Sequence, residues 1–310
     1  MEAARGIGHS IEMVVGRDSG RIEDFCSSYD VPEGSTDLLS LAGAVDAAYI
    51  AVPHSGHCSS TIPLLEASVP VLCEKPLAVN ESEVSKMIRT AESTQTFLME
   101  AMWTRHLPVY EKVLSWVKEG KIGEVVLVEA SFGFNAPYVP ESRLWNPDLA
   151  GGSLLDVGIY TLTLADLIYG SRPEEFSAKA ELSPEGIDKH LGVVAKYPNG
   201  GLARLGSAIN AAIGFSGRVI GTEGMIEIPF FWQAEKATLT SSSSSEDVSI
   251  PHDVNGFEYQ IREVQRCLES GAVESDVVPW SWSLSMSRLM DEIRSEIGVI
   301  YPADKESENG

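Results

Sequence analysis

The chain has 310 residues, and its 45 acidic side chains outnumber its 23 lysines and arginines, which gives a formal net charge of −22. This length suggests two domains or one large one, and 44% hydrophobic with 22% charged residues is the composition of a folded protein. Nucleic-acid phosphates and anionic lipids repel such a polyanion, so we expect neither nucleic acid nor a membrane among its partners.

The sequence also bears on location. Residues 1–6 lack the apolar stretch of a signal peptide. No later run approaches the ~20 apolar residues that span a bilayer. The four cysteines are too scattered for a disulfide framework or a metal knuckle, so we expect reduced thiols and a cytoplasmic protein; they are Cys26, Cys58, Cys73 and Cys267.

The first third of the chain alternates short apolar runs with helical patterns, which indicates a parallel sheet covered by helices. The expected strands cover residues 11–15, 45–52, 69–74 and 96–99. The expected helices cover residues 21–29, 59–68 and 81–92, the last capped by Asn80. This alternation predicts a doubly wound α/β unit.

From about residue 100 the pattern changes to an α+β arrangement. A helix over residues 109–117 ends at Gly120, a long strand covers 124–134, and an apolar helix over 153–169 ends at Gly170. Strands joined by turns then predict a large, open, mostly antiparallel sheet, with segments at 176–182, 191–197, 202–209, 218–221 and 225–228. Beyond it we expect a flexible loop at 241–245, helices over 257–269 and 282–297, and a polar tail at 303–310.

Glu74, Lys75 and Pro76 stand where the third predicted strand ends. Ligands of open α/β sheets bind outside the carboxyl ends of the strands, so a lysine there directs its ammonium into the ligand crevice. The alternative is a solvated lysine paired with Glu74. Pro76 stiffens the backbone and holds Lys75 extended, which favours the first interpretation.

His54 and His57 follow the predicted strand over residues 45–52, at the same edge of the sheet. Histidine titrates near neutral pH, so the pair can carry protons or bind a metal. Their hydrogen bonds can equally satisfy nearby backbone or a bound cofactor. No third His, Cys or carboxylate stands at ligand spacing, so we expect no metal.

Gly151 and Gly152 precede the predicted helix over residues 153–169 and allow a backbone or ligand to approach its N-terminus closely. Asp156 and Tyr160 are four residues apart and share one face of that helix. Because the rest of that face is apolar, both groups would be partly desolvated. A phenol there, with an ammonium such as that of Lys75 nearby, is suited to exchange a proton with an alcohol. The alternative is a buried tyrosine bonded to Asp156.

Together these segments resemble the Gfo/Idh/MocA family of oxidoreductases, named for glucose–fructose oxidoreductase and inositol dehydrogenase, and within it the dihydrodiol dehydrogenase branch. The resemblance rests on residues 45–57, 71–78, 99–105 and 151–160. It implies NAD(P)-dependent hydride transfer to or from a hydroxyl or carbonyl carbon of a small molecule: a sugar, polyol or cyclic diol. It also implies a Rossmann-like dinucleotide-binding domain over residues 1–102 and an α+β domain over 103–310, whose sheet forms a homo-oligomer.

The resemblance further implies roles for individual residues. Lys75 matches the lysine beside the nicotinamide, and Tyr160 matches the general acid/base, with Asp156 orienting it or binding a substrate hydroxyl. His57 matches the histidine of the loop over the cofactor. The other residues expected to bind the cofactor are Pro53, His54 and Glu74, together with Trp103 and Arg105 where the two domains meet.

The end of the predicted strand over residues 11–15 bears on the choice of cofactor. An acidic residue closing the second Rossmann strand binds the ribose 2′-OH, whereas an arginine there accommodates a 2′-phosphate. Here the strand is followed by Gly16, Arg17 and Asp18, so no carboxylate stands at the strand end. We therefore expect NADP, with NAD as the alternative because Asp18 comes one position later.

The strand and glycine-rich loop that open the family's Rossmann domain are absent from the expected place. The run over residues 11–15 corresponds to the family's second strand, while Gly6-Ile7-Gly8 follows no strand and has no third glycine in register. We expect either a late start or another way of holding the dinucleotide, with reduced stability and weak or absent cofactor binding. The competing function is a cofactor-incompetent relative that acts as a binding or oligomerisation module.

A fluorescence titration with NADPH tests this expectation directly. Because no glycine-rich loop is available for the pyrophosphate, the present chain should bind NADPH weakly, and a version with an upstream strand and glycine loop restored should bind it more tightly. Tight binding by the present chain would contradict the expectation.

Overall fold

The computed structural model describes residues 1–242 and 245–307, and the chain divides into two compact units. The first unit comprises Met1–Ala78, Ser82–Trp103 and Asp253–Ser283, and the second comprises Val79–Glu81, Thr104–His252 and Leu284–Gly310. One boundary between the units lies between residues 103 and 104, close to the boundary expected from the sequence. The sequence predicted two continuous domains, whereas in the structure the later segment Asp253–Ser283 belongs to the first unit.

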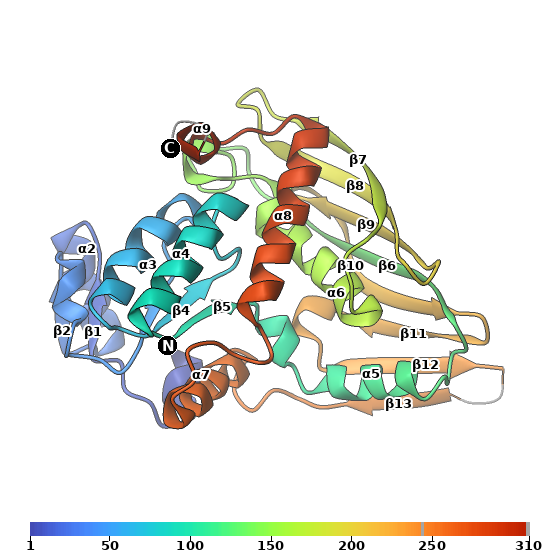
Figure 1. Ribbon diagram of the computed structural model, residues 1–310, viewed down its shortest axis with the longest axis horizontal. Helices are drawn as coiled ribbons and strands as arrows, with labels where there is room; N and C mark the ends of the chain where they lie inside the picture. Colours follow the sequence, from blue (N-terminus) through green and yellow to red (C-terminus); the bar gives the residue numbers. More distant parts are fainter. Residues whose placement is uncertain (243–244, 308–310) are drawn as a thin grey trace. The chain divides into compact units, whose positions relative to one another are not determined.

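The first unit contains parallel strands with helices beside them. Strands β1 (Met13–Val15) and β2 (Glu33–Ser35) form a two-stranded parallel sheet. A second parallel sheet has the order β3-β4-β5, with bounds Ala48–Ile50, Val71–Glu74 and Leu98–Ala101. Figure 1 shows α3 (His57–Glu66) and α4 (Glu81–Thr94) beside this sheet. The predicted Rossmann-type arrangement is thus confirmed.

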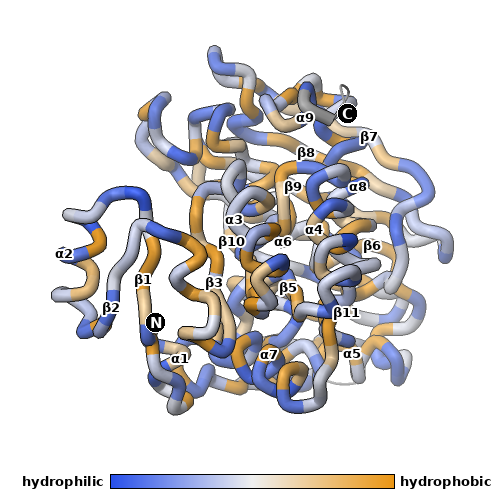
Figure 2. Tube along the Cα trace, turned by 60° about the vertical axis from the view of Figure 1, so that its left-hand side comes forward, coloured by the Kyte–Doolittle hydropathy of each residue, from blue (hydrophilic) through white to orange (hydrophobic). Residues whose placement is uncertain are grey.

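The two parallel sheets leave one edge of β1 and one edge of β3 unpaired among the described strands. Both strands are apolar in Figure 2, yet Val14 is only half-buried and Tyr49 is 51% exposed. No strand of the described part of the chain lies between them, in agreement with the expected lack of the first Rossmann strand. The sequence did not predict β2, because Glu33-Gly34-Ser35 has no apolar alternation.

Residues 253–283 belong to the first unit because they pack against β5. The backbone N–H of Leu98 donates to Val273 O at 3.1 Å, and the indole N–H of Trp280 donates to Leu98 O at 2.9 Å. Helix α1 (Glu2–Gly6) contacts α7 (Glu258–Ser270) in the same unit. This segment therefore closes the edge of the parallel sheet that ends in β5.

The second unit is built on one eight-stranded sheet with the order β13-β12-β11-β10-β6-β9-β8-β7. Every neighbouring pair is antiparallel except β6 and β9, which confirms the expected mostly antiparallel sheet. The strands are β6 (Val125–Asn135), β7 (Glu175–Leu182), β8 (Asp188–Lys196), β9 (Leu202–Ala208), β10 (Asn210–Gly221), β11 (Gly224–Pro229), β12 (Lys236–Ser241) and β13 (Ser245–Ser249).

Helices cover one face of this sheet, as Figure 1 shows for α5 (Val109–Lys118), α6 (Ile159–Tyr169) and α8 (Trp280–Ile297). A π-helical turn, η5 (Leu154–Gly158), leads directly into α6, and Gly170 ends α6 in the left-handed conformation. By length and composition the stretch Pro147–Tyr169 could cross a membrane, a run that the sequence analysis did not recognise. Its 18-residue window is 83% buried inside the structure, as the core helix of a folded unit is.

The remaining elements are short. The 3-10 helices are η1 (Leu38–Leu41), η2 (His54–Gly56), η3 (Trp103–His106), η4 (Pro147–Leu149) and η6 (Phe231–Gln233), and α2 spans Ser19–Tyr29. The sequence missed the β12–β13 hairpin, whose polar strands lie at the edge of the sheet. Of the expected flexible loop, residues 243–244 lie outside the described residues. The expected polar tail instead forms α9 (Pro302–Ser307), and residues 308–310 are not described.

Substituting Trp280 should show that the returning segment stabilises the first unit. Trp280→Ala removes a large side chain that is only 8% exposed, so it should cost about 3–5 kcal/mol in the free energy of unfolding. Trp280→Phe removes the hydrogen bond to Leu98 and part of the buried ring volume, and it should cost about 1–3 kcal/mol. Urea unfolding measures both, with Ile300→Ala as a control because Ile300 is 64% exposed. Equal stability of all three variants would contradict this packing.

Candidate active site

The carboxyl ends of β3, β4 and β5 bring several predicted site residues to one edge of the parallel sheet. Pro53 and His54 follow β3, Glu74 ends β4 with Lys75 directly after it, and Trp103 follows β5. Ligands of parallel sheets bind at this edge. The strand-end placement predicted for Lys75 is therefore found in the structure.

The Glu74 carboxylate organises the turn after β4. It accepts a hydrogen bond from the Lys75 backbone N–H at 3.1 Å and another from the phenol of Tyr49 on β3. Tyr49 was not among the predicted site residues, because residues 45–52 were expected only to form a buried strand. The available signal was a single tyrosine between two residues that are buried, Ala48 and Ile50.

His57 lies beneath this edge of the sheet. Its side chain is 0% exposed, with Nδ1 2.8 Å from Pro76 O and Nε2 3.0 Å from Val52 O. Burial lowers the pKa of the imidazole. The His54 ring lies edge-on to it, with 5.7 Å between the ring centroids. In this structure His57 therefore ties the ends of β3 and β4 together.

Arg17 and Asp18 have different environments after β1. The Asp18 carboxylate accepts a hydrogen bond from the Arg21 backbone N–H at 2.9 Å and caps helix α2. Arg17 is exposed at the strand end. The Asp18 carboxylate thus caps α2, and the exposed guanidinium of Arg17 stands two residues after the strand.

The two residues predicted at the domain boundary fall into different units. In the first unit, Trp103 stacks on Phe257 with parallel rings 4.3 Å apart. In the second unit, Arg105 forms a 2.7 Å ion pair with Asp166 of α6. Phe257 was not singled out in the sequence, because it stands at the start of a helix far along the chain.

The helix that carries Asp156 and Tyr160 is fixed at its start by a buried carboxylate. Asp188 of β8 is 0% exposed and accepts hydrogen bonds from Ser153 Oγ and from the Leu154 backbone N–H, both at 2.7 Å. Burial raises the pKa of Asp188 to about 6. Gly152 has φ +116° and leaves room for this carboxylate, because a Cβ there would lie 2.3 Å from Asp188 Oδ1.

Asp156 and Tyr160 are both buried, at 6% and 7% exposure. The Asp156 carboxylate forms a 2.6 Å ion pair with Arg143, an exposed residue of the loop after β6. No pattern in the sequence points to this partner, because Arg143 stands 13 residues away in an irregular segment. The structure thus pairs Asp156 with a guanidinium and places the Tyr160 ring beside a group of aromatic rings.

Those rings form what we term the aromatic wall, defined as Phe132, Phe215, Phe230 and Trp232. Trp232 stacks on Phe132 at 4.0 Å between centroids, and Phe132 lies 5.6 Å from the Tyr160 ring. Trp232 also contacts Phe215 and Phe230, and its backbone carbonyl accepts a 2.7 Å hydrogen bond from Thr104 Oγ1. An apolar ring or the C–H face of a sugar can stack on such a surface.

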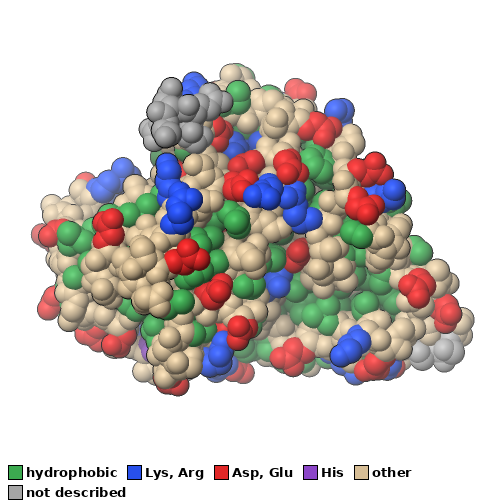
Figure 3. All heavy atoms as spheres, viewed as in Figure 1, with side chains coloured by type: hydrophobic (Ala, Val, Ile, Leu, Met, Phe, Trp, Pro, Cys, Tyr) green, Lys and Arg blue, Asp and Glu red, His purple; other side chains and the backbone are tan. Residues whose placement is uncertain are grey.

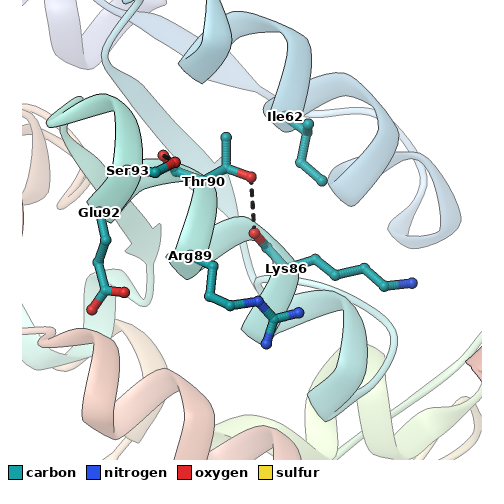
Figure 4. A pocket seen from close by; sticks show the side chains of 6 residues that line it. All are labelled: Ile62, Lys86, Arg89, Thr90, Glu92 and Ser93. Carbon is teal, nitrogen blue, oxygen red and sulfur yellow. Dashed lines mark hydrogen bonds between the residues drawn. The ribbon is translucent and has the colours of Figure 1, made fainter. Parts of the chain in front are cut away.

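A surface groove lies elsewhere. Figure 4 shows a groove of about 740 Å³ on the outer side of α3 and α4, lined by Ile62, Lys86, Arg89, Thr90, Glu92 and Ser93. None of these residues stands at a strand end, so the groove has no link to the residues above. Figure 3 shows acidic and basic side chains interspersed on the visible face. The described residues contain no group of three or more potential metal ligands.

Comparison with known proteins identifies the family. The profile described as an oxidoreductase family with an NAD-binding Rossmann fold matches residues 3–102, and the GFO/IDH/MocA C-terminal domain profile matches residues 110–227. Trans-1,2-dihydrobenzene-1,2-diol dehydrogenase of Mus musculus is 34% identical over 310 residues, which covers 96% of this chain and 91% of the relative. The chain belongs to the Gfo/Idh/MocA family of oxidoreductases.

A second curated relative and two solved structures of the same fold were also found. The Homo sapiens dihydrodiol dehydrogenase is 33% identical over 96% of this chain and 91% of its own length. The aldose-aldose oxidoreductase of Caulobacter crescentus, solved with glycerol, has a TM-score of 0.86 at 22% identity over 95% of this chain and 91% of that chain. The 3-ketoreductase KijD10 of Actinomadura kijaniata, solved with NADP and TDP-benzene, also reaches 0.86, at 23% identity over 96% and 93%. These relatives support an oxidoreductase over the non-enzymatic alternative.

The residues of the first unit fit part of a dinucleotide. Arg17 follows β1, and the residues after β3, β4 and β5 stand at the ligand-binding edge of the parallel sheets. For the pyrophosphate, the described residues offer no strand that leads through a glycine-rich loop into a helix between β1 and β3. The described residues therefore fit the two ends of the cofactor, and none of them forms a glycine-rich loop for the pyrophosphate at its centre.

Substituting Gly152 should disturb the start of the helix that carries Asp156 and Tyr160. Gly152→Ala places a Cβ against Asp188 in a left-handed conformation, so it should cost at least about 1–3 kcal/mol and lower the melting temperature. Gly192→Ala in β8 is the matched control, because a Cβ there meets no atom within 4 Å. Thermal unfolding followed by circular dichroism compares the two variants. Equal melting temperatures would show that Gly152 is not constrained in this way.

Proposed function

We propose that this chain oxidises the hydroxyl, or reduces the carbonyl, of a sugar, polyol or cyclic diol, with NADP(H) as its redox partner. The observation that carries the proposal is the buried Tyr160 phenol, which stands beside the aromatic wall on a helix fixed by Asp188. The named relatives that span nearly the whole chain are diol dehydrogenases. Bound NADP(H) supplies the hydride acceptor or donor at nicotinamide C4.

Tyr160 handles the proton of the reacting hydroxyl in this proposal. In oxidation the phenolate takes the O–H proton while the carbinol carbon gives up a hydride, and in reduction the phenol returns the proton to the carbonyl oxygen. Asp156, held by Arg143 at 2.6 Å, is a fixed acceptor for a second hydroxyl of the substrate. A diol or polyol offers both hydroxyls.

Lys75 supplies positive charge in the same reaction. It follows β4 directly, and its backbone is held by Glu74. An ammonium stabilises negative charge that develops on a reacting oxygen. The lysine and the tyrosine thus have separate tasks: the first stabilises charge, and the second transfers the proton.

NADP is favoured over NAD by the surroundings of Arg17. An acidic residue at this strand end would bind the ribose 2′-OH, but the nearest carboxylate, that of Asp18, is committed to capping α2. Arg17 therefore presents the guanidinium that a 2′-phosphate requires. In a chain with a net charge of −22, this local positive charge selects the phosphorylated cofactor.

We further propose a dimer formed by the uncovered face of the eight-stranded sheet. The three helices lie on the other face in Figure 1, while exposed apolar side chains mark the open side: Val194 (53%), Leu202 (42%) and Ile213 (42%). A second copy of the chain would cover them. A cytoplasmic location is supported by the free thiols of the four cysteines.

Replacing Tyr160 tests the proposed reaction. Tyr160→Phe removes the proton donor, so kcat should fall by about 10²–10⁴-fold while NADPH binding is unchanged. The assay follows NADP reduction across a panel of aldoses, inositols and aromatic dihydrodiols. Tyr138→Phe makes the same chemical change at an exposed tyrosine and should leave kcat unchanged. Full turnover by the Tyr160 variant would remove this residue from the mechanism.

A further inference from the structure

The peptide group between Pro76 and Leu77 is held on both sides by buried titratable side chains. His57 Nδ1 of α3 lies 2.8 Å from Pro76 O, and the Leu77 N–H donates to Glu100 Oε1 of β5 at 3.0 Å. Glu100 is 3% exposed. This peptide begins one residue after Lys75, so its orientation sets the course of the backbone that carries the lysine.

We propose that Glu100 is a positioning residue for Lys75, acting through the negative charge that its carboxylate brings to the hydrogen bond from Leu77. The inference rests on the proposed function, in which Lys75 stabilises charge at the reacting oxygen. A main-chain N–H in a buried turn needs an acceptor, and a backbone carbonyl or a glutamine would serve without a charge. A buried carboxylate adds a negative charge behind the lysine.

The charged and titratable groups that face Glu100 come from neighbouring elements. Lys75 and Glu74 follow and end β4, and the Cys73 thiol is buried in the same strand. Ser283, at the start of α8, donates a hydrogen bond to the carboxylate. His57 faces Glu74 and Lys75 from the other side of the turn. Lys75 is the one cation in this set apart from a protonated His57.

Burial raises the pKa of Glu100 to about 7, because desolvation outweighs the hydrogen bonds from Ser283 and Leu77. Above pH 7 the carboxylate is charged and binds the Leu77 N–H more strongly than its neutral form does. Below pH 7 the proton returns, and the charge behind Lys75 is lost. Burial lowers the pKa of His57, so the imidazole gains its proton at lower pH than a free histidine.

As the pH rises, the hydrogen bond from Leu77 becomes stronger, but the contribution of Glu100 to the stability of the fold decreases. Between the ordinary glutamate pKa of 4.5 and about 7, the folded protein keeps a proton on Glu100 that the unfolded chain has released. The contribution of Glu100 to stability therefore falls as the pH rises through this range. At pH 8 Glu100→Gln should consequently unfold at a urea concentration equal to or higher than that for the native chain. A purely structural glutamate would give the reverse result.

The experiment labels lysine with ¹³C at Cε and follows the Lys75 resonance by NMR from pH 5.5 to 9, with Lys75→Arg used to assign it. The native chain should show a step near pH 7 that is absent in Glu100→Gln and retained in the control Glu66→Gln, an exposed glutamate of α3. Glu100→Gln should also lower kcat about tenfold or more and remove an ionisation near pH 7 from the kcat/KM profile.

The outcomes separate this inference from the proposed function. A native chain without a step near pH 7, or a step that persists in Glu100→Gln, would overturn the inference. Loss of stability at pH 8 in Glu100→Gln, with kcat unchanged after correction for the folded fraction, would do the same. If the step behaves as expected but no member of the panel is turned over, the inference about Lys75 stands and the proposed function fails.

Discussion

The arrangement at the sheet edge depends on one constraint: a buried peptide group must find hydrogen-bond partners outside the sheet. The Pro76–Leu77 peptide has left β4, so no neighbouring strand serves it. His57 contacts its carbonyl and Glu100 accepts from its N–H. The turn that follows Lys75 is therefore fixed by side chains from α3 and β5.

In the second unit, too, a buried carboxylate accepts a backbone N–H. Asp188 accepts the backbone N–H of Leu154 where the π-helical turn begins, two turns before Tyr160. Burial raises the pKa of both Asp188 and Glu100 toward neutrality. The charged form of each carboxylate is less favourable because burial removes it from water. In each unit, a buried acid thus holds the backbone of the segment that carries a residue with a proposed chemical task.

The sequence predicted the strand-end position of Lys75 and the helix that carries Tyr160, because both depend on local periodicity and on glycines. It did not predict Tyr49, Arg143 or the aromatic contacts of Trp232, because those partners are brought together by pairing between strands distant in the chain. The return of residues 253–283 to the first unit was missed for the same reason. His57 was expected in the loop over the cofactor, which stays a prediction; in the structure it is 0% exposed, and its two ring nitrogens lie 2.8 and 3.0 Å from backbone carbonyl oxygens.

Isotope transfer tests the central claim, that a hydride passes between a carbinol carbon and the nicotinamide. The native chain would be incubated with NADP and either an aldose deuterated at C1 or an aromatic dihydrodiol deuterated at its carbinol carbons. Proton NMR of the isolated NADPH then measures how much deuterium C4 carries. Deuterium is expected at one face of C4. Two results would contradict hydride transfer: substrate oxidation that leaves C4 unlabelled, and no oxidation of either substrate class.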